Sequence, residues 1–166
     1  MTHMTVAELT SRVEEARDLF LQAVRAVSPA DFTHAPSPEE WSAAQIAGHA
    51  IEVQTFWATQ AERIVQRDNP LIGRVTEADK QARRRSFGEG APQTIPETVN
   101  RFAAASVEAL RRLRALSDAD LQRQGHHPDG RVVTAQQIIE HTIVSHLEEH
   151  ARQMEKTAAS LHSKTA

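Results

Sequence analysis

The sequence predicts an all-α protein, a four-helix bundle with a long crossover between its second and third helices. Four stretches of the chain carry apolar residues three or four positions apart, which is the period of an amphipathic helix. No stretch alternates polar and apolar residues as a half-buried strand does. The length of 166 residues is typical of one domain, so we expect a single bundle domain over residues 1–166.

The helix boundaries follow from the apolar spacing and from residues that start or stop helices. The first helix is expected from about Thr5 to Val27 and the second from about Glu39 to Arg67, each followed by a proline-containing pair. The third opens with Pro96 in its first turn, where proline loses no helical hydrogen bond. The fourth is expected from about Thr134, which suits an N-cap, to about Ser160.

Residues 68–95 interrupt this pattern. They contain several glycines and prolines and few apolar anchors, so we expect a long crossover with one helical turn near Glu77 to Arg84. Loops of this length in a compact domain are usually functional or mobile. The cluster Arg83-Arg84-Arg85 lies here, and it has two interpretations: a clamp for a substrate carboxylate, or an exposed run of charge.

Composition excludes several functional classes. The chain has no cysteine, which removes disulfides, thiolate metal ligands and cysteine nucleophiles. Nineteen Lys and Arg against 22 Asp and Glu give a net charge of −3, which argues against nucleic acid as the main partner. No apolar run approaches the length of a membrane span, and the stretch Met1–Val6 lacks the basic and apolar regions of a signal peptide. We therefore expect a cytoplasmic protein with a small-molecule substrate, no nucleic acid and no membrane.

Histidine is unusually frequent in this sequence, which contains nine of them. His146 and His150 are four positions apart, so they lie on one side of the fourth helix, together with apolar residues such as Ile143. His49 lies within the apolar stripe of the second helix. Three inward histidines from two helices can offer three imidazole nitrogens to one divalent cation. The alternative is a polar cluster in the core, which would have to satisfy three buried rings by hydrogen bonds.

The other histidines carry no such pattern. His141 is five residues before His146, about 140° around a regular helix and on the polar side, so we interpret it as a surface or groove histidine. His126 and His127 lie in a loop, where solvation is the expected state.

Two better-known metal motifs are absent from these helices. A zincin has His-Glu-x-x-His, but here the glutamates Glu148 and Glu149 lie between the two histidines and off their face. A di-iron bundle has Glu-x-x-His, but apolar residues stand three positions before His49, His146 and His150.

One pattern in the sequence combines Trp41-Ser42, His49 and His146-x3-His150-x2-Gln153. This pattern resembles the DinB/YfiT-like superfamily. The specific match is confined to residues 41–57 and 134–153. The resemblance implies a four-helix bundle and frequent homodimers. It also implies a divalent transition metal, zinc or nickel and sometimes iron or manganese, held by His49, His146 and His150. Gln153 would orient one of the ligand rings. Characterised relatives include isomerases and transferases that depend on a low-molecular-weight thiol.

The leading hypothesis is therefore a metal-dependent, thiol-dependent transferase or isomerase. A thiol bound to the metal would be deprotonated and become a nucleophile at neutral pH. Glu52, three residues after His49, is the carboxylate that we name as a candidate base. One alternative is a metal-dependent hydrolase, in which the ion activates water. Another is a non-catalytic, stress-associated bundle in which the metal is structural or absent. An open coordination position would favour the enzyme, and a fourth protein ligand would favour the non-catalytic bundle.

Overall fold

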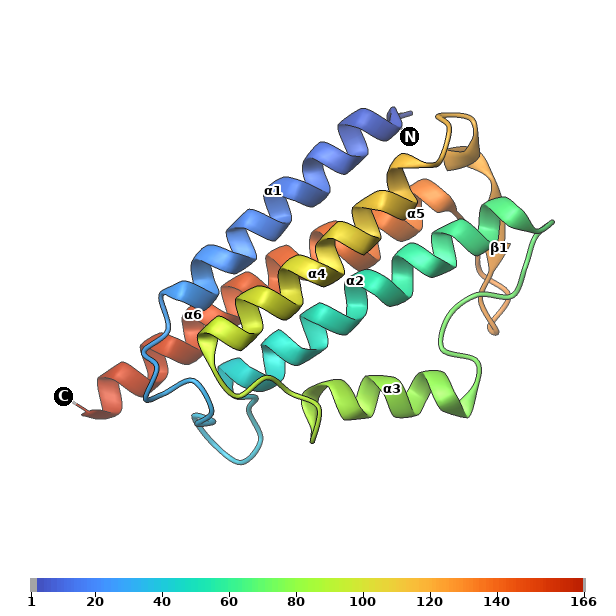
Figure 1. Ribbon diagram of the computed structural model, residues 1–166. Coiled ribbons are helices and arrows are strands. Elements are labelled where there is room, and N and C mark those ends of the chain that lie inside the picture. The colour runs from blue at the N-terminus through green and yellow to red at the C-terminus, as the bar shows by residue number, and fades with distance from the viewer. Residues whose placement is uncertain (1–2, 166) are drawn as a thin grey trace.

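The protein folds as a bundle of four long helical segments, seen side by side in Figure 1. The structure, a computed structural model, describes residues 3–165; the outermost residues of the domain expected over 1–166 lie outside the described range. The four segments are α1 (Val6–Arg25), α2 (Ala43–Gln66), α4 (Ile95–Arg114) and a composite helix made of α5 (Ala135–Ile139), the π-helical η2 (Glu140–Val144) and α6 (Ser145–Thr165).

Reciprocal side-chain caps decide where most helices begin. At Thr5, Ser42, Thr76 and Thr134 the hydroxyl accepts from the backbone N–H three residues later, whose own side chain accepts in return. The expected N-cap at Thr134 and the expected Pro96 in the first turn of α4 are confirmed. The expectation that the second helix begins at about Glu39 is wrong. It begins at Ala43, because the cap at Ser42 satisfies its first free N–H groups.

The helix directions explain why the crossover is long. In Figure 1, α2 and α4 run the same way, and α1 and α6 run the opposite way. Helix α2 packs against α4, and α1 packs against α6. Two parallel neighbours cannot be joined by a short turn, so the chain must return along the full length of the bundle between α2 and α4.

Three further features depart from the sequence-based expectations. The crossover holds a complete helix, α3 (Glu77–Phe87), in place of the single expected turn. A hairpin of β1 (Gln124–His126) and β2 (Val132–Thr134) precedes the last helix, although the sequence predicts no strand. A π-helical segment, η2, interrupts the fourth helix. Strands of three residues are too short to show alternation, and one extra residue in a helical turn leaves no sequence signal.

The apolar stripes of the four segments form one core. Phe20 of α1 stacks on Phe102 of α4 with ring centroids 4.9 Å apart, and both side chains are fully buried. The inward residues of α2 include Ile46 and Val53, which flank His49. In the described part of the chain, no helix has both the length and the apolarity that a membrane crossing requires.

Candidate metal centre

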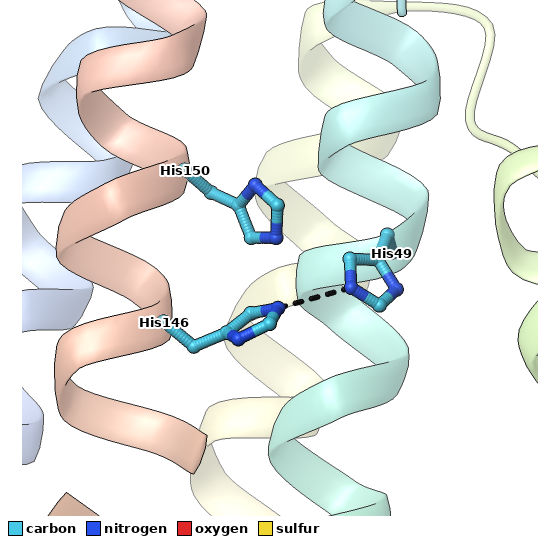
Figure 2. Close-up of side chains that lie close together, drawn as sticks. All are labelled: His49, His146 and His150. Atoms are coloured by element: carbon cyan, nitrogen blue, oxygen red, sulfur yellow. Dashed lines mark hydrogen bonds between the residues drawn. The ribbon is translucent and has the colours of Figure 1, made fainter. Parts of the chain in front are cut away.

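Three histidines from two helices converge inside the bundle. His49 comes from α2, and His146 and His150 come from successive turns of α6, as Figure 2 shows. The Nε2 atoms of His49 and His146 are 3.0 Å apart. One ligand atom from each of the three rings lies within 4.8 Å of the others. The structure thus brings together the three residues that the sequence predicted as ligands, here called the His triad.

The helix faces explain this convergence. His49 is 3% exposed because it occupies an inward position of α2, and the two α6 histidines are half-buried. Residues four apart on an α-helix lie one above the other, so His146 and His150 reach across to the same level of α2.

The hydrogen-bond partners leave one nitrogen that faces the centre of the triad free. The Nδ1–H of His150 donates to Oε1 of Gln153 over 2.8 Å, since an amide oxygen can only accept. This leaves the lone pair of His150 on Nε2, which is buried and has no partner among the described residues. The Nε2 atoms of His49 and His146 are hydrogen-bonded to each other, and the Nδ1 atom of His49, on the other side of its ring, is buried without a partner among the described residues. Because an unsatisfied buried polar atom costs about 1–3 kcal/mol, a ligand at Nε2 of His150 would remove one such cost.

Electrostatics keep the triad neutral. Burial, together with the charges of the other two triad histidines, Arg83 and Arg74, lowers the pKa of His49 from 6.5 to about 3. Burial lowers the pKa of His146 to about 4 and also lowers the pKa of His150. Neutral imidazole is the form that binds a metal. No proton therefore has to be displaced from these rings near neutral pH.

The donor set fits a divalent transition metal. Imidazole nitrogens bind zinc at about 2.0–2.1 Å, which in a tetrahedral site places two of them about 3.3 Å apart. The observed 3.0 Å between His49 and His146 is close to that spacing. Among the described residues, no fourth His, Cys, Asp or Glu joins the cluster. Three protein ligands with a free position are the arrangement of catalytic zinc sites rather than of closed structural ones.

Aromatic side chains cover the triad on the side of α3. Trp41, just before the N-cap of α2, stacks on Phe87 at the end of α3 with centroids 4.7 Å apart. The Trp41 ring centroid is 5.5 Å from His49 and 6.4 Å from His150. The position of Phe87 beside the triad depends on Gly48, where a Cβ atom would lie 1.9 Å from the carbonyl oxygen of Ser86. The bare glycine lets the end of α3 approach α2.

A cavity of about 430 Å³ reaches the triad at His150. Trp41, Gln153, Lys156 and Thr157 also line it, together with two glutamates of the segment before α2. A volume of this size suits a small molecule. A larger groove of about 900 Å³ lies elsewhere, between α1 and the α5–η2 segment, and contains none of the triad. His141 lines that groove and is exposed, as expected of a histidine that is no ligand.

The candidate base Glu52 is engaged by an arginine. Arg74 donates from both terminal nitrogens to the two Glu52 oxygens, over 2.6 and 2.7 Å, and its guanidinium lies 4.1 Å from the centre of the Phe56 ring. Glu52 thus holds Arg74 near the triad, and its role as a base stays a prediction.

Sequence reasoning missed Phe87, Arg74 and the close approach at Gly48. Each lies in or packs against the crossover, whose path the apolar spacing of the helices does not determine. A glycine one residue before a predicted ligand is the one signal that could have pointed to a close backbone contact.

Comparison with known proteins identifies relatives of this arrangement. The sequence model of the DinB superfamily matches residues 12–154. No curated protein matches the chain by sequence. Among solved structures, YfiT from Bacillus subtilis, described as a probable metal-dependent hydrolase with an unusual four-helix bundle topology, is similar with a TM-score of 0.74 and 15% identity. That match covers 95% of this chain and 87% of YfiT.

Two further structures share the fold. The mycothiol-dependent maleylpyruvate isomerase matches with a TM-score of 0.68 and 15% identity, over 93% of this chain and 63% of the isomerase. The colibactin self-resistance protein ClbS, solved in complex with double-stranded DNA, matches with a TM-score of 0.69 and 11% identity, over 92% of this chain and 94% of ClbS. At these identities the likeness concerns the fold.

Proposed function

Because the chain belongs to the DinB superfamily, we propose that it is a metal-dependent enzyme of the thiol-dependent transferase or isomerase type. In this proposal His49, His146 and His150 hold the metal, and zinc or nickel is the expected ion because imidazole suits both. The observation that carries the proposal is the convergence of three neutral imidazoles, with no fourth ligand among the described residues, beside a cavity that a small molecule fits.

A bound divalent transition metal would act as a Lewis acid that lowers the pKa of a thiol or water reaching it. The residues of the chain have complementary tasks. Gln153 holds the Nδ1 proton of His150 and so turns its Nε2 toward the site. Trp41 and Phe87 exclude water from one side of the triad. The cavity at His150 offers Lys156 and Thr157 to the remainder of a bound thiol.

A hydrolase is the second candidate. It is favoured by the likeness to YfiT, which extends over almost the whole chain, and by the same free position at the triad, which a water molecule can occupy as readily as a thiol. The two candidates differ in whether a thiol is required. A small-molecule substrate and a homodimeric state stay predictions for both.

Metal content is the first test. The protein purified without chelators should contain about one equivalent of transition metal per chain. Content below half an equivalent that is not restored by soaking with zinc or nickel would contradict a metal-dependent function.

Thiol dependence is the second test. In the cobalt-substituted protein, small thiols should change the visible absorption spectrum and bind more tightly as pH rises, because binding releases a proton. Turnover of an electrophile should then need both metal and thiol, and His49→Ala should abolish it while the protein stays folded. A spectrum that responds to hydroxide but not to thiols would favour the hydrolase. A spectrum that responds to neither would favour the non-catalytic bundle.

A further inference from the structure

The composite fourth helix contains one extra residue at η2. The N–H of Glu140 donates to the carbonyl of Gln136, four residues back, as in a regular α-helix. The N–H of Ser145 donates to the carbonyl of Glu140, five residues back. A turn that closes over five residues adds one residue to the helix, so it rotates α6 relative to α5.

This rotation lets α5 and α6 face the same core. A regular helix turns about 100° per residue, which would place the core-facing residues of α6 about 60–120° around the axis from Ile139 of α5. One extra residue takes about 100° back, so these residues lie within about 40° of Ile139. They are Leu147, Ala151 and Met154, which are buried in one cluster with Ile139. Each step along the chain is still three or four residues, so the mismatch becomes visible only from the buried faces.

Contacts that do not involve α6 fix the orientation of α5. The side-chain amide of Gln122 donates to the side-chain oxygen of Gln136 over 3.1 Å. At the start of η2, Arg12 of α1 donates to Glu140 over 2.6 Å. Without the extra residue, α6 would therefore turn by about 100°, and its two triad histidines would no longer face α2.

Thr142 is the one residue of η2 with a hydroxyl, and that hydroxyl donates to the carbonyl oxygen of Ile138. In a regular helix this oxygen accepts the N–H of residue 142, so the hydroxyl competes with the regular bond and favours a wider turn. Thr59 donates in the same way to Thr55, over 2.9 Å, within the unbroken helix α2. The hydroxyl alone thus does not create a π-helical turn. At Thr142 it acts where the two buried faces already require an extra residue.

We propose that Thr142 is a positioning residue for the His triad. By stabilising η2 it holds α6 in the rotation that directs His146 and His150 toward His49. The proposal rests on the proposed function, because it concerns the same metal site. Thr142 itself would touch neither the metal nor a substrate.

The test removes the hydroxyl and keeps the branched shape of the side chain, in Thr142→Val. Zinc affinity, measured by competition with a chromophoric chelator, should fall ~10-fold, as for other residues that orient metal ligands. Thr142→Ser keeps the hydroxyl and should stay within about twofold of the unaltered protein. Thr59→Val is the matched control and should also stay within about twofold, because it removes the same kind of bond from a regular helix. A purely structural role would lower stability in urea and leave the zinc affinity of the folded protein unchanged.

A second measurement needs no metal. The ring centroids of His49 and His146 are 5.2 Å apart, so NMR cross-peaks between their ring protons report the rotation of α6 in the metal-free protein. These cross-peaks should weaken in Thr142→Val and remain in Thr59→Val. Unchanged cross-peaks in Thr142→Val, a zinc affinity equal to that of Thr59→Val, or an equal loss in Thr142→Ser would overturn the proposal. If the unaltered protein binds no zinc, the metal-dependent function is wrong, and the cross-peaks alone decide the role of Thr142.

Discussion

The His triad and the larger groove between α1 and the α5–η2 segment are two polar regions of the same bundle. In the groove, Nη1 of Arg12 donates to Glu140 over 2.6 Å, and the side-chain amide of Gln136 donates to the same carboxylate. In the triad, buried nitrogens of His49 and His150 have no partner among the described residues. The groove is about twice as large as the cavity at the triad, yet Arg12, Gln136 and Glu140 in it are already paired with one another. The larger volume therefore does not mark the candidate site, which is marked by three converging histidines with an unpartnered buried nitrogen on His150.

The largest expected difference between the two regions is in metal affinity. His146→Ala or His150→Ala should weaken zinc binding by ~1,000-fold or more, because a ligand and the arrangement of the other two are lost. His141→Ala, in the groove, should leave the affinity within about twofold. Competition with a chromophoric chelator measures all three. Loss of zinc from His141→Ala would mean that the groove, and not the triad, contains the site.

A smaller loss of affinity is expected at Gln153. Gln153→Leu removes the acceptor for the Nδ1 proton of His150, and the loss of such a partner typically weakens metal binding by ~10–100-fold. Gln153→Glu restores an acceptor and should recover most of the affinity. Isothermal titration with zinc measures both variants. Equal affinity in Gln153→Leu and the unaltered protein would show that the amide does not orient the ring.

The close packing near the triad predicts a stability effect. In Gly48→Ala the new methyl group would overlap the Ser86 carbonyl oxygen, so α3 must move, at a cost of about 1–3 kcal/mol in the free energy of unfolding. Ser11→Ala on the exposed wall of the groove should change it by less than about 0.5 kcal/mol. Urea unfolding compares the two. Equal stability of both variants would show that α3 is not held tightly against α2.

A further effect is expected on the pH dependence of stability in the metal-free protein. The pKa of His49 is about 3 in the folded state and near 6.5 when unfolded, so the unfolded state binds more protons between these values. The free energy of unfolding should fall as pH drops from 6.5, by up to about 1.4 kcal/mol per pH unit for this residue. His49→Ala should reduce the slope between pH 6.5 and 5, above the range in which carboxylates titrate. His141→Ala should not change it, and an unaltered slope in His49→Ala would show that the triad is not buried as a neutral cluster.

Much of the site was predictable because it depends on local periodicity. Inward positions of an amphipathic helix are set by the 3.6-residue repeat, so the apolar spacing alone places His49, His146 and His150 on core-facing stripes. The resemblance to the DinB superfamily names the same three residues, and the match over residues 12–154 confirms the family. The exposed position of His141 also follows from helix rotation, although the π-turn makes the rotation between His141 and His146 differ from that of a regular helix.

The tertiary structure decided what surrounds the triad. The sequence of residues 68–95 lacks the apolar spacing that would orient α3, and its position follows from the return path between two parallel helices. That path places Phe87 on Trp41 and leaves Arg83 without an acidic partner among the described residues, while Arg74 is held by Glu52. Short-range spacing thus determines which face of a helix a residue occupies. Contacts between distant segments depend on how the helices pack, because only the folded chain brings Gly48 within reach of Ser86.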